Sequence, residues 1–209
     1  MARDLKLNGV ATMPPFFSLI TPTLLRQSLV KTCASVGSQS FTDWEHVVIV
    51  DCDHEQWLSR SVLIEDIRHP ARNIVRCPDA HKNFGNTCRH DAWHLVQGHY
   101  LLYLDDDNFL ADELVLAEIQ QALCESEMPP VAIFPIHRHG QRFYFMPPRL
   151  GYVDTANLLV KRDLGQWPNV ADYDADGKFI ERLVQEHGVR GFDWFRPIIF
   201  MPCSSGGEP

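Results

Sequence analysis

Three consecutive aspartates, Asp105–Asp107, directly follow the apolar run Tyr100–Leu104. A run of this length and composition predicts a buried strand, so the carboxylates come at its carboxyl end. Carboxylates this close together repel one another in a partly buried place unless something compensates them. Mg²⁺ and Mn²⁺ take carboxylate oxygens and often keep substrate phosphates in their other positions. The triplet therefore predicts a divalent-metal site, with a solvated turn that begins at Asp107 or Asn108 as the alternative.

Two other acidic groups have spacings that suit chemistry. Asp51 and Asp53 follow a second apolar, β-branched run, His46–Val50. Asp174 and Asp176 precede a stretch with helical spacing of its apolar residues. A carboxylate within hydrogen-bond reach of a hydroxyl can take its proton, so the late group could supply a general base. The alternative for that group is a helix N-terminus, where aspartate is favourable in any case.

A predicted helix near the middle of the chain places Arg89 in its first turn, where a cation is unfavourable to the helix dipole. A phosphate or carboxylate partner would explain this arginine, and an ordinary surface position is the alternative. On the same helix, His90 and His94 are four residues apart and share a face. The pattern resembles the H-E-x-x-H of zinc hydrolases with Asp in place of Glu, but no third ligand follows at a familiar spacing.

Strands and helices alternate through the first half of the chain. The expected strands lie at residues 16–20, 46–50, 73–76 and 100–104, and the expected helices follow the first strand, the third strand and Asp112. Such continuous apolar strands are typical of a parallel sheet that helices cover on both faces. Ligands of these sheets bind beyond the carboxyl ends of the strands. We therefore expect Asp51, Asp53 and the Asp105–Asp107 triplet to face one crevice.

Two of these helices have predicted ends that depend on single residues. Pro22 suits the first turn of a helix, with a flanking threonine as its cap. The stretch Asn83–Gly98 predicts a helix that Asn86 caps and Gly98 ends.

The second half differs in composition. Strands are expected at residues 131–136, 143–146 and 158–160, while residues 137–142 and 146–151 are rich in Pro, Gly, His and Arg and predict loops. This indicates an antiparallel or mixed extension of the sheet. No repeat or long linker divides the chain, so we expect a single domain over residues 1–203 and a disordered tail over residues 204–209.

Bulk composition excludes several classes of protein. The chain has 209 residues, 45% hydrophobic and 22% charged, with a net charge of −8 and no compensating basic cluster, so nucleic acid is not an expected partner. The six cysteines form no C-x-x-C pair and are expected to be reduced thiols of a cytoplasmic protein. Residues 1–15 show no signal-peptide pattern, and no apolar run reaches 18 residues, so any membrane contact would be peripheral.

Four stretches in order resemble the family 2 glycosyltransferases with the GT-A fold, over about Phe16 to Phe200. They are "FSLITPTLLRQSLVKTCASVGSQSF", "HVVIVD" with the following Cys-Asp, "NFGNTCRHDAWHLVQGHYLLYLDDDN" and "ADYDADGKFIERL". They are similar to the opening strand and first helix, the second strand with its acidic end, the arginine helix with the D-x-D strand, and the late acidic segment. The resemblance implies a Rossmann-like, mixed and mainly parallel α/β sheet that helices flank.

The resemblance also implies an activity: inverting transfer of a sugar from a nucleoside-diphosphate sugar to a hydroxyl of a sugar, lipid-linked or protein acceptor, with Mn²⁺ or Mg²⁺ as cofactor. Its site residues map onto this sequence as follows. Nucleotide-sugar contacts are expected from Thr21, Pro22, Asp51, Asp53, Arg89, Asp105 and Asp106, the last of which could also be a bystander. The metal is expected on Asp107, with support from Asp105. The catalytic base is expected at Asp176, with Asp174 next.

Three alternatives stay open from the sequence. A nucleotidyltransferase on a similar sheet would use the same metal carboxylates. A zinc hydrolase would use His90 and His94. A non-catalytic relative would keep the fold and bind nucleotide sugars. The nucleobase, the sugar, the acceptor and the oligomeric state are not determined, and a homo-oligomer in which another subunit completes the acceptor side is one option.

Overall fold

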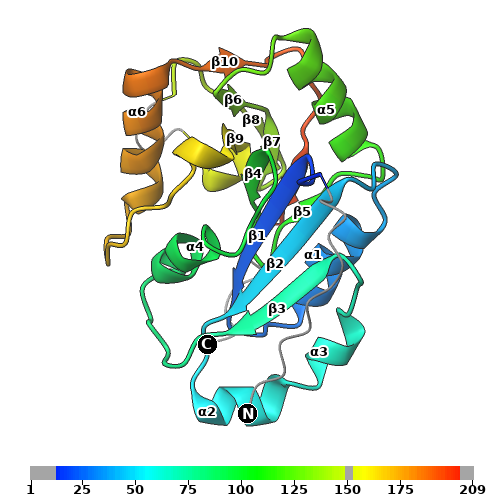
Figure 1. The fold of residues 1–209 in the computed structure, drawn as a ribbon, viewed down its shortest axis with the longest axis vertical. Helices are drawn as coiled ribbons and strands as arrows, with labels where there is room; N and C mark the ends of the chain where they lie inside the picture. Colours follow the sequence, from blue (N-terminus) through cyan, green and yellow to red (C-terminus); the bar gives the residue numbers. More distant parts are fainter. Residues whose placement is uncertain (1–12, 149–152, 203–209) are drawn as a thin grey trace.

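The protein folds into three layers, a central β-sheet between two layers of helices (Figure 1). The structure is a computed structural model that describes residues 13–148 and 153–202. Over these residues the main sheet has seven strands in the order β10-β6-β9-β4-β1-β2-β3. They are β1 (Phe17–Thr23), β2 (Trp44–Val50), β3 (Arg72–Arg76), β4 (Tyr100–Tyr103), β6 (Val131–Ile133), β9 (Leu158–Lys161) and β10 (Arg190–Gly191).

Strand directions confirm the mixed, mainly parallel sheet that the sequence predicts. β9 is antiparallel to both of its neighbours, β4 and β6. The other neighbouring pairs are parallel. Because β1, β2 and β4 run the same way, their carboxyl ends lie along one edge of the sheet, where the acidic residues follow.

Helices cover both faces of the sheet. They are α1 (Ser28–Gly37), α2 (His54–Arg60), α3 (Leu63–Asp66), α4 (Asn86–Ala92), α5 (Val115–Glu125) and α6 (Ala175–His187), with short 3-10 turns η1 (Thr155–Asn157) and η2 (Arg162–Leu164). Strand side chains alternate between the two layers. In β4, Leu102 packs in the cluster that includes residues of α1 and α5, whereas Leu101 and Tyr103 pack in the cluster that includes residues of α4 and α6. None of the helices in the described ranges is long and apolar enough to cross a membrane.

A second sheet extends the fold in the second half of the chain. Its strands in the described residues, in order, are β5 (Phe109–Leu110), β11 (Ile199–Met201), β7 (Ile136–Arg138) and β8 (Gln141–Phe143). The expectation of a loop over residues 137–142 was therefore wrong. His139 and Gly140 both have positive φ, at 49° and 84°, which suits the two-residue turn of a β-hairpin. That turn joins β7 to β8, which pair antiparallel.

Two predicted helix ends were also wrong. Pro22 lies inside β1 and not in a helix, which begins only at Ser28. The middle helix ends at Ala92 and not at Gly98, because the following N–H groups, such as that of Leu95 to Ala92 at 2.8 Å, bond three residues back and close the last turn. Gly98 has a different role: a Cβ there would lie 2.5 Å from the Ser18 hydroxyl oxygen, so the glycine permits close approach to β1. The predicted tail, residues 204–209, lies outside the described residues.

Candidate active site

A cavity of about 300 Å³ opens beyond the carboxyl end of β4. It lies between α4, the start of α6 and the segment that leads into η1. Its lining residues are Phe84, Asn86, Arg89, Asp105, Arg138, Val153, Asp154, Thr155, Trp167, Tyr173, Asp174 and Asp176. The fold therefore brings together four residues that the sequence singled out from three separate stretches, namely Arg89, Asp105, Asp174 and Asp176.

Arg89 and Asp105 form an ion pair in the lining of this cavity. The Arg89 guanidinium is buried, and it forms an ion pair with Asp105 through Nη2 while Nη1 donates to the Phe84 carbonyl at 2.8 Å. It also lies over the Trp167 ring, 5.2 Å from the centroid. A carboxylate partner for the arginine of this helix is thus confirmed. Since Asp105 is held by this pair, its position in the cavity is fixed by α4.

Two further carboxylates face Asp105 across the cavity. Burial raises the pKa of Asp176, and the negative charge of Asp105 raises it further, while the Arg89 guanidinium opposes both effects. The pKa of Asp154 is raised mainly by burial and then by Asp105 and Asp176. All three carboxylates line the same cavity of about 300 Å³, an arrangement typical of functional sites. Asp174 is exposed at the rim, where it precedes α6.

Asp154 is a cavity residue that the sequence reasoning missed. It caps η1: its Oδ1 accepts the N–H of Ala156 at 3.1 Å, and Asn157 Oδ1 accepts the N–H of Asp154 at 3.0 Å. An ion pair of 3.8 Å to Arg138 holds its other oxygen. The Asp-x-x-Asn spacing of this reciprocal cap is visible in the sequence and was the signal that could have found it.

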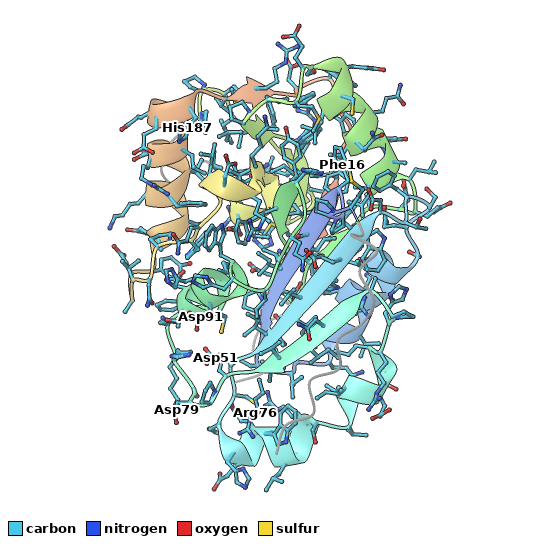
Figure 2. All side chains as sticks on the ribbon, in the orientation of Figure 1. Phe16, Asp51, Arg76, Asp79, Asp91 and His187 are labelled. Carbon is cyan, nitrogen blue, oxygen red and sulfur yellow. The ribbon has the colours of Figure 1, made fainter. Side chains whose placement is uncertain are left out.

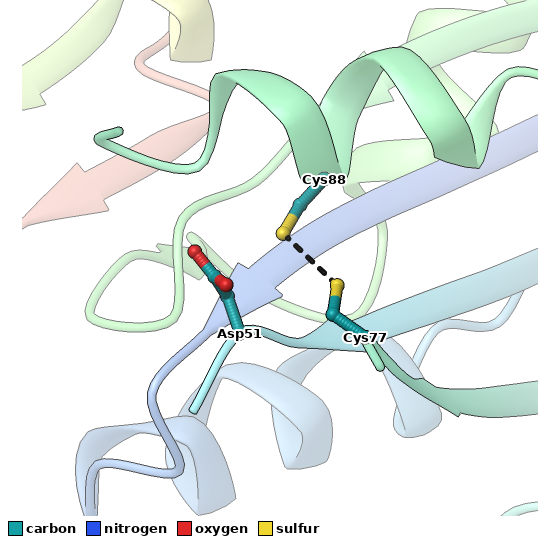
Figure 3. A group of neighbouring side chains, drawn as sticks. All are labelled: Asp51, Cys77 and Cys88. Atoms are coloured by element: carbon teal, nitrogen blue, oxygen red, sulfur yellow. Dashed lines mark hydrogen bonds between the residues drawn. The ribbon is translucent and has the colours of Figure 1, made fainter. Parts of the chain in front are cut away.

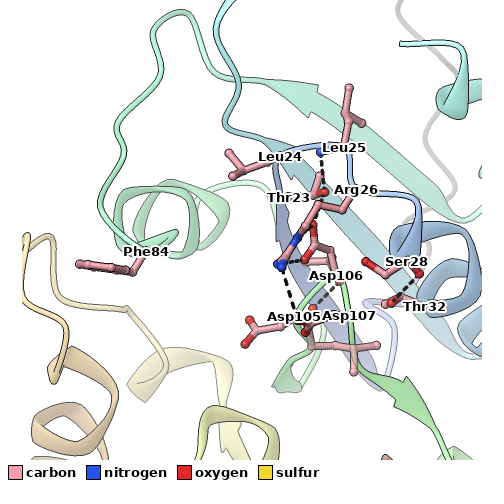
Figure 4. A network of polar contacts seen from close by, with 12 residues as sticks. Thr23, Leu24, Leu25, Arg26, Ser28, Thr32, Phe84, Asp105, Asp106 and Asp107 are labelled. Carbon is pink, nitrogen blue, oxygen red and sulfur yellow. Dashed lines mark hydrogen bonds and ion pairs between the residues drawn. The ribbon is translucent and has the colours of Figure 1, made fainter. Parts of the chain in front are cut away.

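The other two aspartates of the triplet turn away from the cavity toward Arg26, which comes from the loop after β1 (Figure 4). Asp106 is fully buried and accepts hydrogen bonds from Arg26 and, at 2.6 Å, from the Thr23 hydroxyl. Burial raises the pKa of Asp106, and these two donors oppose the rise. Asp107 is partly exposed, and its ion pair with Arg26 is longer, at 3.4 Å. Asp106 therefore has an internal structural role, while Asp107 remains open to solvent.

Thr21 and Pro22 lie within the sheet and support its edge. The Thr21 hydroxyl is buried, donates to the Leu104 carbonyl at 2.7 Å and contacts His46 Nε2 at 3.0 Å. Pro22 packs against Gly85, where a Cβ would lie 2.9 Å from the Pro22 Cβ. Gly85 precedes α4, so Pro22 helps to position the helix that bears Arg89. Neither residue lines the cavity, and their expected nucleotide contacts stay predictions.

Asp51 and Asp53 also lie outside the cavity lining. Asp53 caps α2, since its Oδ1 accepts the N–H of Gln56 at 2.9 Å. Asp51 follows the carboxyl end of β2 (Figure 2), is buried, and accepts the N–H of His81 through Oδ1 at 2.7 Å. The expected single crevice for all the strand-end carboxylates is therefore divided: Asp105 faces one side, Asp106 and Asp107 face Arg26, and Asp51 faces the loop after β3.

The triplet suits a metal that arrives with a phosphate ligand. Mg²⁺ is commonly bound by one or two carboxylates while phosphate oxygens and water fill its other positions. Asp107, with 45% of its side chain exposed and one loose ion pair, fits that description. Asp105, two residues away, is the expected second carboxylate, although Arg89 holds its Oδ1. In the part of the chain that the structure describes, no cage of three carboxylate or histidine ligands surrounds Asp107.

The zinc-hydrolase alternative gains no support from the histidines. His90 Nδ1 is 2.7 Å from the Trp167 carbonyl oxygen, and the His90 and His94 rings are 6.3 Å apart. Over residues 13–148 and 153–202, no group of three metal-ligating side chains includes either histidine.

A mainly parallel sheet that helices cover on both faces, with carboxylates at the end of β4, has the architecture of the GT-A fold. Solved structures agree. Residues of S. aureus TarS 1-349 superpose with a TM-score of 0.69 at 14% identity, covering 89% of this chain and 60% of that chain. TarS 1-349 in complex with UDP-GlcNAc gives a TM-score of 0.70 at 14% identity, covering 91% and 59%.

The mannosyltransferase PcManGT from Pyrobaculum calidifontis, solved in complex with GDP-Man and Mn²⁺, has a TM-score of 0.65 at 15% identity and covers 94% of this chain and 59% of that one. The chain thus spans about 60% of the length of these solved chains. No protein-family model matches the sequence, and a search of curated proteins finds no relative. At these identities the likeness establishes the GT-A fold.

Proposed function

We propose that this protein is a glycosyltransferase that moves a sugar from a nucleoside-diphosphate sugar to an acceptor hydroxyl. The observation that supports it best is the cavity beyond β4, in which Asp105, Asp154 and Asp176 surround the buried Arg89. The same cavity belongs to a fold shared with proteins solved with UDP-GlcNAc and with GDP-Man. Open α/β sheets also bind their ligands beyond the carboxyl ends of their parallel strands.

The base of this reaction is assigned to Asp176. An acceptor hydroxyl is a poor nucleophile and has to lose its proton during attack, which a carboxylate within hydrogen-bond reach can accept. Asp176 lies in the cavity on the first turn of α6, with its pKa raised by burial. A raised pKa makes the carboxylate a stronger base than an exposed aspartate. Asp174 is more exposed, so it is the second candidate. Attack opposite to the departing diphosphate would invert the anomeric centre.

We assign the binding site of the donor diphosphate to the side of the aspartate triplet on which Asp107 and Arg26 lie. A Mn²⁺ or Mg²⁺ ion bound by Asp107 together with the diphosphate would neutralise the charge of the leaving group. Arg26 lies on the same side, with 51% of its side chain exposed and its guanidinium between Asp106 and Asp107. A cation there is suited to orient phosphate oxygens. Asp105, held by Arg89, separates this donor side from the acceptor side at Asp176.

Ligand-dependent unfolding tests this proposal. We expect UDP, GDP or one of their sugar conjugates to raise the melting temperature in the presence of Mn²⁺. Binding to the native state at a concentration 100 times Kd contributes about 2.7 kcal/mol to the free energy of unfolding. The Asp107→Asn variant should lose the Mn²⁺-dependent part of the shift. If no nucleoside diphosphate or nucleotide sugar changes the melting temperature, with or without Mn²⁺, the proposal is wrong.

Product analysis with the donor that binds completes the test. Transfer or slow hydrolysis of the donor should release a nucleoside diphosphate. A nucleotidyltransferase would instead release pyrophosphate from a nucleoside triphosphate, and a non-catalytic relative would bind without releasing either product.

A further inference from the structure

A second group of potential ligands lies apart from the cavity. Asp51 follows β2, Cys77 follows β3, and Cys88 lies in α4. Their side chains converge between the strand ends and α4 (Figure 3). The Cys77 and Cys88 sulfur atoms are 3.6 Å apart. One ligand atom from each of the three residues lies within 4.8 Å of the others. None of the three lines the cavity that holds Asp105 and Asp176.

The separation of the two sulfur atoms is close to that of two thiolates on one tetrahedral zinc ion. With Zn–S bonds of about 2.3 Å and Zn–O bonds of about 2.1 Å, tetrahedral angles place two sulfurs about 3.8 Å apart and a sulfur and an oxygen about 3.6 Å apart. The observed sulfur separation of 3.6 Å is close to the first of these values. Two thiolates with one carboxylate are donors that zinc accepts in proteins and that Mg²⁺ or Ca²⁺ does not favour.

The surroundings of Asp51 provide independent support. The side chain is 5% exposed, and Cys77 and Cys88 are 6% and 0% exposed. Among the described residues Asp51 has no ion-pair partner of any kind. A buried carboxylate without a counter-charge is costly. Its Oδ1 accepts the His81 N–H at 2.7 Å, which fixes its orientation and leaves the other oxygen available, as outer-shell hydrogen bonds do in metal sites.

We propose that Asp51, Cys77 and Cys88 bind one zinc ion. Binding would release the two thiol protons, and it would join the carboxyl ends of β2 and β3 to α4. Three protein ligands leave the fourth tetrahedral position to water. The ion would hold the loop between β3 and α4, from which the helix with Arg89 begins. Asp51 is also an expected nucleotide contact, so zinc and the nucleotide would compete for this carboxylate. The site is separate from the cavity and from His90 and His94, whose zinc role the geometry does not support.

Cobalt substitution tests the site in the full chain. The protein is reduced, treated with a chelator and titrated anaerobically with Co²⁺, which replaces zinc and gives sulfur-to-metal charge-transfer and tetrahedral d–d absorption. We expect both absorptions to saturate at one Co²⁺ per chain and to disappear when Zn²⁺ is added. The Cys77→Ala/Cys88→Ala variant should lose them, and Asp51→Asn should weaken binding at least tenfold. Cys33→Ala, a buried cysteine in α1, and Cys124→Ser, an exposed one, should bind as the wild type does.

A measurement on the wild-type chain tests the site even if the double variant does not fold. Cys77 and Cys88 are buried, so the wild-type chain is alkylated in enough urea for both thiols to react without metal. Zn²⁺ should then protect these two thiols, as mapped by peptide mass spectrometry, while Cys124 stays reactive. The proposal is overturned if the reduced wild-type protein shows no thiolate–cobalt absorption, if the absorption survives in the double variant, or if Zn²⁺ leaves both thiols as reactive as before.

Discussion

At the scale of single residues, the acidic triplet after β4 is compensated by two arginines that lie far from it in the sequence. Arg89 pairs with Asp105, and Arg26 pairs with Asp106 and Asp107. From the sequence we expected these carboxylates to bind a divalent cation or to lie in a solvated turn. Arg26 was not expected there, because nothing in the loop after β1 predicts that its side chain crosses to the end of β4. A metal at Asp107 therefore has to be accommodated beside a guanidinium.

Removal of Arg26 should destabilise the protein. Arg26→Ala leaves the buried carboxylate of Asp106 with only the Thr23 hydroxyl as a side-chain donor. An uncompensated buried charge costs several kcal/mol, but Arg26 is half exposed, so solvent screens part of the effect and we expect a loss of roughly 1–3 kcal/mol. Urea unfolding measures it.

A double-mutant cycle isolates the pair. Asp106→Asn keeps the shape of the side chain and removes the charge that needs Arg26. The double variant should therefore lose less stability than the sum of the two single variants, by at least about 0.5 kcal/mol. Strict additivity would show that Arg26 acts through something other than Asp106.

Substitution of Asp176 should remove the base without removing donor binding. Asp176→Asn should lower kcat about 10²- to 10⁴-fold, the usual worth of a general base, and leave the nucleotide-dependent thermal shift unchanged. Asp172→Asn is the matched control from the same segment, because the Asp172 side chain pairs with Lys178 and does not line the cavity. A loss of activity below tenfold in Asp176→Asn would refute the assignment.

The acid limb of activity should report the environment of Asp176. Burial raises the pKa of this carboxyl group above its ordinary value. A base works only when ionised, so kcat/KM should fall as the pH drops through this raised pKa, above the value of about 3.9 for an exposed aspartate. Measured against pH, kcat/KM of the wild type and of Asp174→Asn should fall over the same acidic range. The residual kcat/KM of Asp176→Asn should not show this fall.

At the scale of the elements, hydrophobic pattern predicted where strands and helices lie, and local packing decided where they end. β2 and β4 follow from their continuous apolar runs. β1 extends through Pro22 because it stays paired with β2 there, and Pro22 also packs against Gly85, a residue more than sixty positions away. α4 ends at Ala92 although its sequence continues in a helical pattern, since the next N–H groups bond three residues back and Gly98 then packs closely against β1. Such tertiary contacts cannot be predicted from the sequence of one segment alone.

Gly85 is the residue on which the start of α4 depends. Its φ is +76°, and a Cβ would lie 2.9 Å from Pro22 and 3.2 Å from Arg89 Nη1. Gly85→Ala should therefore cost the strain of a left-handed alanine, about 1–2 kcal/mol, and in addition displace Arg89 and with it Asp105. We expect loss of stability by urea unfolding together with loss of activity.

Gly140→Ala separates the two effects. Gly140 has a similar φ of +84°, but a Cβ there would meet nothing within 4 Å. This variant should show the strain alone, with activity unchanged. Equal losses of stability and activity in the two variants would mean that contact with Pro22 and Arg89 is unimportant.

At the scale of the whole molecule, the cavity forms where the two halves of the chain meet. Arg89 and Asp105 come from the alternating first half, and Asp154 and Asp176 come from the irregular second half. The sequence indicated the acidic groups of both halves and the parallel sheet. The acidic groups of the two halves come together because β9 pairs antiparallel between β4 and β6. This pairing brings the second half of the chain beside the end of β4. Strand order of that kind does not follow from periodicity.

One ion-pair network ties the segment before β11 to α5 and to the residues just before it, and its pH dependence can be measured. Arg196 donates to both oxygens of Asp112 and, at 2.9 Å, to Glu118. The hydrogen bond from Arg196 is the largest cause that lowers the pKa of Asp112. Because the folded-state pKa lies below that of the unfolded chain, about 3.9, the carboxylate stabilises the fold above that pH. The contribution is lost as the pH falls through the lower, folded-state value.

We expect Asp112→Asn to reduce the free energy of unfolding by about 1 kcal/mol or less at pH 7, since the pair is partly exposed, and the difference from the wild type to shrink below about pH 4. Urea unfolding of both proteins from pH 7 to pH 3 measures this difference. The amide of the variant can still accept the N–H of Leu114, as Asp112 does at 2.9 Å, so the comparison isolates the charge. A stability difference for Asp112→Asn that grows as the pH falls would contradict the sign of the assigned pKa shift.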